Sequence, residues 1–156
     1  MLRPKTNIAI NVSSSDASSR YEEKSDGQLY FFHEEEKNWN DALSICQREM
    51  RGASLAIVDQ EETLKVVKSY SKKFWLGGTD EKVDGEWLWI QPFRSNQRFS
   101  NTTTQFFEWG GPEPNGEERE NCLALNYNDG NGGLDAGCTD RQFSFLCQLT
   151  KKSKYK

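Results

Sequence analysis

The four cysteines of the chain constrain its fold more than any other feature. Cys46, Cys122, Cys138 and Cys147 are even in number, and none belongs to a Cys-x-x-Cys pair or lies near a second histidine. Structural zinc sites use such pairs, so disulfides are the better interpretation. Four cysteines allow three pairings, and their spacing does not choose among them. Paired cysteines in a small domain indicate a secreted protein.

Other sequence features agree with an extracellular setting. Glycosylation sequons begin at Asn11 and Asn101, as in a secreted glycoprotein. No apolar run reaches the roughly 18 residues that a membrane span needs, and residues 1–20 lack the apolar core of a signal peptide. The net charge of -4 disfavours a nucleic-acid surface, which would carry a basic patch.

The length of 156 residues predicts about one domain. Residues 1–26 are polar and serine-rich, with almost nothing to bury, so we expect a disordered N-terminal segment or stalk. The folded domain is predicted over residues 27–149. Residues 150–156 form a basic tail, interpreted as a solvated end.

Two helices are predicted in the first half of the domain. Asn38 can cap the first, in which Trp39, Ala42, Leu43 and Cys46 share one face. Asp59 with Glu62 resembles a capping box, which predicts a second helix to about Tyr70. Apolar or alternating runs predict strands at 28–32, 54–58, 74–78, 86–90, 123–127, just before Cys138, and 143–148.

No catalytic constellation is visible. His33 stands beside three glutamates with no serine, cysteine or lysine partner, so we interpret it as a solvated edge residue. Glu117 and Glu118 are explained as loop charge, and no enzyme is predicted. Four tryptophans lie in elements with their own periodic pattern and are expected in the core: Trp39, Trp75, Trp87 and Trp89.

The segment 91–121 shows no convincing helix or strand over about thirty residues, and so long a stretch in a compact domain is expected to be functional. Its last nine residues, followed by Cys122, read Glu-Pro-Asn-Gly-Glu-Glu-Arg-Glu-Asn and place oxygen donors at Glu113, Asn115 and Glu120. Ca²⁺ takes about six to eight such oxygens. A bound cation offsets the ordering cost of a loop that buries little apolar surface. The segment therefore predicts a calcium site.

Several motifs occur in an order that resembles the C-type lectin domain, over about residues 28–149. They are Asn38-Trp39-Asn40-Asp41-Ala42 through Cys46, Trp75-Leu76-Gly77-Gly78, Glu113-Pro114-Asn115, Glu120-Asn121-Cys122, and Cys138 with Cys147. The resemblance implies an α+β C-type lectin fold with two helices, antiparallel sheets and a long calcium-binding loop region. It also implies disulfides between Cys46 and Cys147 and between Cys122 and Cys138, in the short form of the domain.

The Glu-Pro-Asn triplet resembles that of mannose-type sites, in which calcium contacts two vicinal sugar hydroxyls. Each hydroxyl gives a lone pair to calcium, donates its proton to a carboxylate and accepts a hydrogen bond from an amide. The resemblance assigns one such pair of roles to Glu113 and Asn115, with a cis bond before Pro114. It adds Glu120 and Asp135 as ligands of both calcium and carbohydrate.

One position departs from the family pattern, because Leu134 stands where an asparagine usually precedes Asp135. With two oxygens from Asp135 and one from each other ligand, the protein offers five, and two hydroxyls give about seven, within the range of calcium. The sugar hydroxyl near Glu120 therefore lacks an amide donor, and the missing hydrogen bond weakens sugar binding by about 0.5 to 1.5 kcal/mol. Asn128 or Asn131 is a possible substitute, and the alternative is a glycine-rich turn with no ligand.

A second calcium position of the family is partly matched. Asp80 and Asp84 stand where two of its carboxylates are expected, whereas Gly116 stands where another acid usually follows the triplet.

Two functions follow. The first is calcium-dependent recognition of mannose-type or fucose-type glycans on cells or microbes, as in innate immunity. A single site with a Kd near 1 mM has a binding free energy of only about -4 kcal/mol, so we expect oligomers or partner chains to supply avidity. The second is a protein-binding or adhesion module that keeps the fold with an impaired sugar site.

Overall fold

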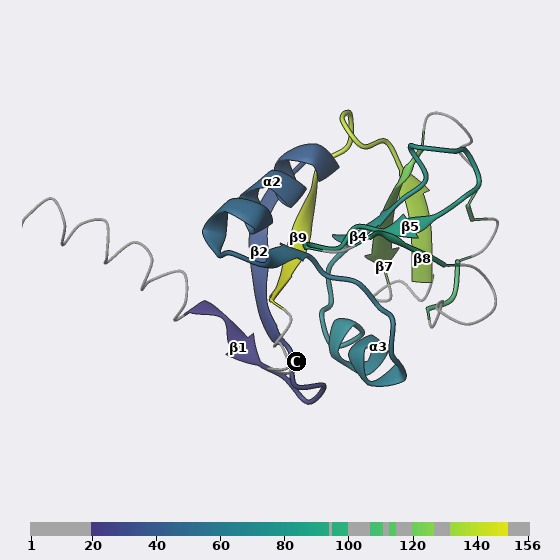
Figure 1. Cartoon of the computed structure of the whole chain (residues 1–156). Helices are drawn as coiled ribbons and strands as arrows, with labels where there is room; N and C mark the ends of the chain where they lie inside the picture. The colour runs from purple at the N-terminus through teal and green to yellow at the C-terminus, as the bar shows by residue number, and fades with distance from the viewer. Residues whose placement is uncertain are drawn as a thin grey trace, which may run out of the picture.

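The structure, a computed structural model, describes residues 20–93, 95–99, 107–110, 113–114, 120–126 and 132–149. Two helices and one sheet form its frame (Figure 1). The helices are α2 (Trp39–Glu49) and α3 (Glu61–Val67). The strands are β1 (Glu22–Glu23), β2 (Leu29–Lys37), β3 (Ala53–Leu55), β4 (Phe74–Thr79), β5 (Leu88–Trp89), β6 (Gln97–Arg98), β7 (Cys122–Asn126), β8 (Gly132–Ala136) and β9 (Phe143–Leu149).

Strand β9 is the centre of the sheet. It pairs antiparallel with β2 and β3 and parallel with β4, and β4 continues to β5 and to the β7–β8 hairpin. The sequence predicts antiparallel sheets, whereas the β4–β9 pair makes the sheet mixed. The long connection between these two strands permits parallel pairing, which a hairpin does not.

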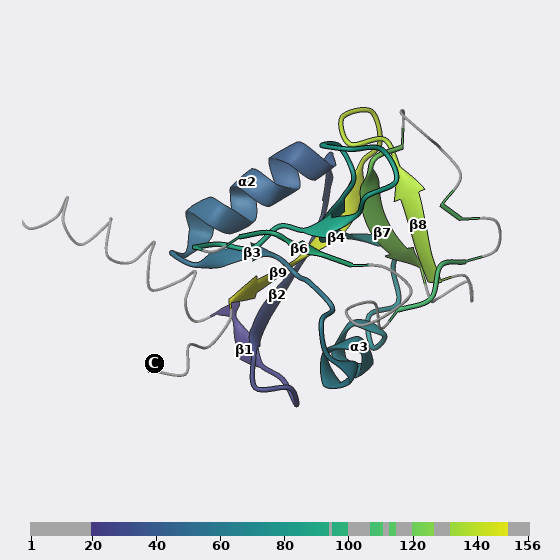
Figure 2. The ribbon, with the colours of Figure 1, turned by 45° about the vertical axis from the view of Figure 1, so that its right-hand side comes forward.

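Helix α2 forms as predicted. The Asn38 side chain accepts a hydrogen bond from the Asp41 amide at 2.8 Å, and the helix buries Trp39, Ala42 and Cys46. The Trp39 indole donates to the Leu76 carbonyl at 2.8 Å, which fixes the helix to β4. In Figures 1 and 2 the helix lies along the sheet over β3 and β9.

The predicted capping box of α3 is wrong. The N-cap residue is Gln60, in an extended conformation, and its side chain makes no capping hydrogen bond. Because the N-cap lies one residue after the predicted cap, Asp59 and Glu62 are out of register with the first turn of the helix. The helix also ends at Val67 rather than near Tyr70. Beyond Val67, the amides of Ser69 and Tyr70 donate to carbonyls three residues earlier in the sequence, as in a 3₁₀ turn.

Both predicted disulfides are present. Cys46 bonds to Cys147 and so joins α2 to β9, while Cys122 bonds to Cys138 across the β7–β8 hairpin. The bonded cysteines are 101 and 16 residues apart in the sequence. By loop entropy they contribute about 4.7 and 3 kcal/mol, as model-dependent upper values.

The core consists of two clusters on opposite faces of the sheet, because neighbouring β9 residues alternate between them. Leu146 belongs to the cluster covered by α3, and Phe145 and Cys147 belong to the cluster covered by α2. The four tryptophans expected in the core are all buried, which confirms that packing explains them: Trp39, Trp75, Trp87 and Trp89.

Folded chain begins earlier than the boundary drawn at residue 26. Strand β1 pairs with β2, with Glu22 opposite Tyr30. The Tyr21 ring is buried, and its hydroxyl donates to a Glu49 carboxylate oxygen at 3.0 Å. Residues 1–19 and the predicted tail at 150–156 lie outside the described part. Neither described helix has the length and apolar character that crossing a bilayer requires.

Candidate functional site

Three of the four predicted ligands come together beside the β7–β8 hairpin. Asp135 lies in β8 opposite Leu123, one residue from the start of β7, and Glu120 lies two residues before the first residue of that strand. The Gly110 amide donates to the Gly133 carbonyl, and the Glu113 amide donates to the Gly110 carbonyl, both at 2.8 Å. These two bonds bring Glu113 alongside β8. The fourth ligand, Asn115, lies outside the described residues.

Glu113 and Asp135 form the centre of this acidic site. Asp135 is buried, with 4% of its surface exposed. Burial, together with the neighbouring Asp135 carboxyl and the charge of Glu120, raises the pKa of Glu113 to about 7. One buried oxygen of Glu113, Oε1, has no hydrogen-bond partner among the described residues. The bond between Glu113 and Pro114 is cis, as predicted.

Three charged side chains act on Glu120 besides burial. Burial raises its pKa, the charges of Asp135 and Asp140 raise it further, and the Arg141 guanidinium lowers it. Arg141 was not singled out in the sequence, because it is far along the chain from the acidic stretch. The Cys122–Cys138 disulfide brings the two segments together.

A second acidic pair adjoins the first. Burial raises the pKa of Asp80 to about 6, opposed by a hydrogen bond from the Gly85 amide at 2.8 Å. The carboxyl of Asp84 and the more distant charge of Asp135 also raise it. The Oδ1 atom of Asp80 is buried and has no hydrogen-bond partner among the described residues. Two of the residues expected at an auxiliary calcium position are therefore adjacent, while Gly116 lies outside the described part.

Leu134 takes no part in the polar site. It lies opposite Ala124 in the hairpin and packs, half-buried, against the cluster under α2. Adjacent strand residues point to opposite faces, so its side chain is directed away from the face of Asp135. The possible substitutes Asn128 and Asn131 lie outside the described residues.

The donor set fits a hard cation. The three described ligands supply carboxylate oxygens, which suit calcium and magnesium, and the orphaned oxygen of Glu113 is a ligand atom with no competing partner. Burial is the largest cause of the raised pKa values of Glu113 and Glu120, and repulsion from the neighbouring Asp135 carboxylate adds to it. A divalent cation would remove that repulsion.

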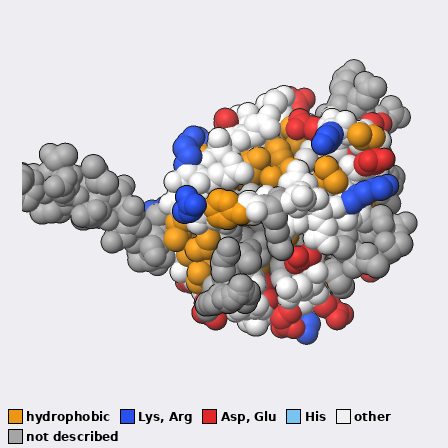
Figure 3. Space-filling view, in the orientation of Figure 1, with side chains coloured by type: hydrophobic (Ala, Val, Ile, Leu, Met, Phe, Trp, Pro, Cys, Tyr) orange, Lys and Arg blue, Asp and Glu red, His pale blue; other side chains and the backbone are white. Residues whose placement is uncertain are grey.

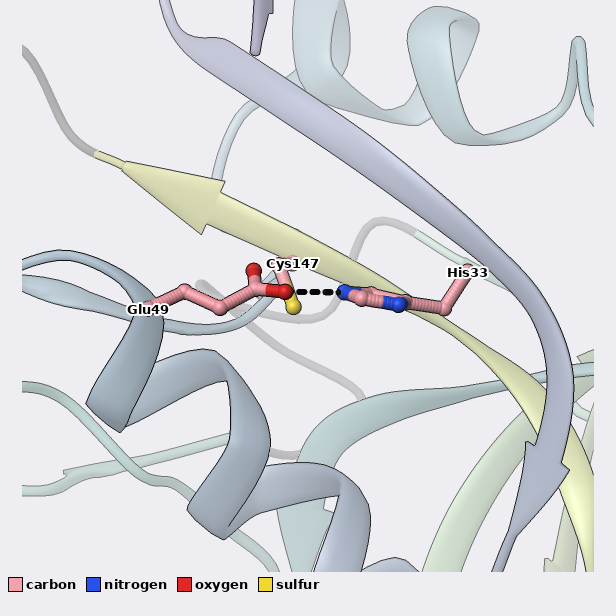
Figure 4. A group of neighbouring side chains, drawn as sticks. All are labelled: His33, Glu49 and Cys147. Carbon is pink, nitrogen blue, oxygen red and sulfur yellow. Dashed lines mark ion pairs between the residues drawn. The ribbon is translucent and has the colours of Figure 1, made fainter. Parts of the chain in front are cut away.

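A different group, His33, Glu49 and Cys147, also has metal-ligand atoms close together (Figure 4). The His33 Nε2 atom lies 2.9 Å from a Glu49 oxygen, but the Cys147 sulfur is bonded to Cys46 and cannot act as a thiolate ligand. The prediction that His33 is solvated is wrong. Its ring stacks on Phe145 at 4.3 Å and is half-buried between β2 and α2.

Comparison with known proteins gives one family and several relatives. The family model for the lectin C-type domain matches residues 35–149. A perlucin-like protein of Mytilus galloprovincialis is 30% identical over 128 residues, which cover 76% of this chain and 74% of that protein. CD209 antigen-like protein C of Mus musculus is 28% identical over 131 residues, which cover 81% of this chain and 66% of that protein. The chain spans only 46% of CD209 antigen-like protein 2 of Macaca mulatta.

Solved structures agree on the fold. A Ca²⁺-dependent type II antifreeze protein in its Ca²⁺-free form matches with a TM-score of 0.68 and 29% identity, covering 85% of this chain and 98% of that protein. The carbohydrate-recognition domain of mouse scavenger receptor C-type lectin matches with a TM-score of 0.65 and 21% identity, covering 86% and 96%. The second likeness is one of fold alone.

Proposed function

Since the chain belongs to the C-type lectin domain family, we propose that it binds carbohydrate through a calcium ion held by Glu113, Asn115, Glu120 and Asp135. The observation that carries this proposal is the meeting of three acidic side chains beside one hairpin, with a buried Glu113 oxygen left without a partner among the described residues. The family is one of binding domains, so the chain is not an enzyme.

Calcium, when bound, would supply a positive centre that accepts lone pairs from sugar hydroxyls. The protein's own groups would complete the recognition. Glu113 would accept a hydrogen bond from one hydroxyl while Asn115 donates its amide hydrogen to the same oxygen. Glu120 would accept a hydrogen bond from the second hydroxyl, and Asp135 would hold the calcium beside it. This order of acceptor and donor suits mannose-type and fucose-type sugars.

Leu134 sets the strength of this interaction. Its side chain has no oxygen or nitrogen and packs against the core, so the second hydroxyl receives no amide donor from this position. A missing hydrogen bond of this kind weakens binding by about 0.5 to 1.5 kcal/mol. We therefore propose a low-affinity site that acts on clustered glycans of cell or microbial surfaces, from a secreted protein whose avidity comes from oligomers or partner chains.

Calorimetric titration tests the proposal. Calcium is titrated into metal-free protein, and mannose is then added in the presence and absence of a chelator. Heat from calcium, followed by heat from mannose only without chelator, is expected. The swap of Glu113→Gln with Asn115→Asp exchanges acceptor and donor and should move preference toward galactose. An unchanged sugar preference in that variant would show that these two side chains do not contact the sugar.

A second function, binding of a protein partner, is favoured by one observation. The position that usually supplies an amide is occupied by a packed leucine, Leu134. The antifreeze proteins among the similar structures, one of them a calcium-independent type II antifreeze protein, indicate that this fold also has functions other than sugar binding. Binding to a protein that is unaffected by chelator, together with no heat from mannose, would favour this alternative.

A further inference from the structure

Two adjacent glycines begin strand β8, and both contact segment 107–110. Gly133 pairs with β7 on one side and forms a parallel bridge with Trp109 on the other. Its amide donates to the Glu108 carbonyl at 2.7 Å, and its carbonyl accepts from the Gly110 amide at 2.8 Å. Segment 107–110 is therefore hydrogen-bonded to the edge of β8 that β7 leaves open.

Neither of the two glycines leaves room for a side chain. A Cβ atom on Gly133 would lie 2.6 Å from the Phe107 ring, well inside the roughly 3.5 to 4.0 Å at which carbon atoms pack. A Cβ atom on Gly132 would lie 2.3 Å from the Glu108 carbonyl oxygen, which already accepts from the Gly133 amide. Gly132 also has a φ of 96°, which residues with side chains rarely adopt. Gly132 and Gly133 are called the glycine pair below.

The Phe107 ring attaches the segment to the core on the other side. The ring is buried, and its centroid lies 5.8 Å from that of Phe99 and 5.2 Å from that of Trp109. Alternate residues of a strand share one face, so the ring lies over Gly133 on the face from which Asp135 projects. The aromatic cluster is therefore on the same side of β8 as the acidic site.

Two backbone hydrogen bonds connect the glycine pair to a proposed calcium ligand. The Glu113 amide donates to the Gly110 carbonyl, and the Gly110 amide donates to the Gly133 carbonyl, both at 2.8 Å. These bonds tie Glu113 to the strand that carries Asp135. A side chain at either glycine would push segment 107–110 away from β8 and so break the bond between Gly110 and Gly133.

We propose that the glycine pair positions Glu113, and that the affinity of the site for calcium depends on this placement. The two glycines act through segment 107–110 and offer no side chain to the metal or the sugar. Groups that orient metal ligands commonly change metal affinity by about 10- to 100-fold. The inference rests on the proposed function, because the position of Glu113 affects calcium affinity only if Glu113 is a ligand.

Calorimetric titration of calcium into Gly133→Ala and Gly132→Ala tests the inference. Each variant should bind calcium at least about tenfold more weakly than the wild type. In chelator, the Gly110 and Glu113 amides should exchange hydrogen slowly in the wild type and faster in both variants. Gly27→Ala is the matched control, because Gly27 has a φ of 83° but a Cβ atom there would meet nothing within 4 Å. The control should keep the wild-type Kd and exchange rates.

A second substitution separates the placement of Glu113 from a general loss of stability. Phe107→Leu, added to Gly133→Ala, replaces the ring that the new methyl group would meet with a smaller and more flexible side chain. The double variant should recover part of the lost calcium affinity, whereas urea unfolding in chelator measures the stability of each variant separately. No recovery of affinity would contradict the contact with the ring as the cause. If Gly133→Ala does not fold, Gly132→Ala and the exchange rates of the wild type still test the inference.

The outcomes separate this inference from the function on which it rests. No heat from calcium in the wild type would overturn the proposed function and, with it, the dependence of affinity on the glycine pair. Hydrogen exchange in chelator needs no metal and would still decide whether the pair holds Glu113. Calcium binding that is equal in the wild type and Gly133→Ala would overturn the inference alone. Fast exchange of the Glu113 amide in the wild type, or an equal loss of affinity in Gly27→Ala, would also overturn it.

Discussion

Replacing Glu113 with glutamine should separate the stability of the metal-free protein from its affinity for calcium. In the metal-free protein the Glu113 carboxylate lies against Asp135 and is partly buried, so its ionised form is unfavourable. Glutamine keeps the size of the side chain and removes the charge. The variant should therefore be more stable than the wild type without calcium and should bind calcium more weakly.

The magnitude follows from the pKa of Glu113. A tenfold change in an ionisation constant is worth about 1.4 kcal/mol, so the displacement from 4.5 to about 7 would be about 3 kcal/mol in a fully dry site. Glu113 is only partly buried, and solvent screening reduces the expected gain to about 1 kcal/mol. For comparison, calcium at ten times its Kd would stabilise the wild type by about 1.4 kcal/mol.

Urea unfolding at about pH 8, where Glu113 is ionised, measures both effects. In chelator, the Glu113→Gln midpoint should exceed that of the wild type. On adding calcium, the wild-type midpoint should rise and the variant midpoint should rise much less. Glu117→Gln, outside the described residues but in the same acidic stretch, is the control for a simple change of net charge. A variant that is less stable in chelator and equally stabilised by calcium would refute the assigned role of Glu113.

Three further predictions concern other parts of the molecule. Because the pKa values of Glu113 and Asp80 are raised, the folded metal-free protein binds more protons than the unfolded chain between about pH 4.5 and 7. Its free energy of unfolding, measured by urea titration, should therefore fall as the pH rises through that range. Saturating calcium should remove this fall. Leu134→Asn should tighten calcium binding in calorimetry, and no gain would mean that another group already fills the position. Glu49→Gln should lower the free energy of unfolding by about 1 to 3 kcal/mol and speed amide hydrogen exchange in β1. The reason is that Glu49 accepts a hydrogen bond from the Tyr21 hydroxyl and forms an ion pair with His33. Unchanged hydrogen exchange in β1 would contradict this anchoring role of Glu49.

The features that the sequence predicts correctly depend on local patterns. Helix α2 has both a capping side chain in Asn38 and an apolar face that includes Cys46, and both are visible within one short segment. The disulfide pairing is different, because it is implied by the resemblance to a whole family and not by the spacing of the cysteines. The match of that family's model to residues 35–149 and the two observed bridges confirm it.

The features that the sequence does not predict depend on contacts between distant segments. The burial of His33 requires Glu49 from α2 and the ring of Phe145 from β9, neither of which is near it in sequence. Strand β1 is too short and polar to show a pattern, and it is ordered through Tyr21 and the register with β2. Arg141 is distant from Glu120 in sequence, and the Cys122–Cys138 bridge links their two segments. On the face shown in Figure 3, acidic and basic side chains are interspersed, which sequence counts alone do not reveal.

The acidic site persists in the metal-free fold because its frame is stabilised elsewhere. Glu120 and Asp135 are attached to β7 and β8, which are paired along their whole length and closed by a disulfide worth up to about 3 kcal/mol. The carboxylate repulsion at Glu113, about 1 kcal/mol after screening, is smaller than that contribution. Calcium would therefore meet two ligands already in place and would act mainly on the chain near Glu113. The affinity for calcium should then depend more on the number of ligand groups than on the free-energy cost of bringing them together. Position 134, where Leu134 offers no side-chain oxygen, is therefore the decisive position for the strength of the site.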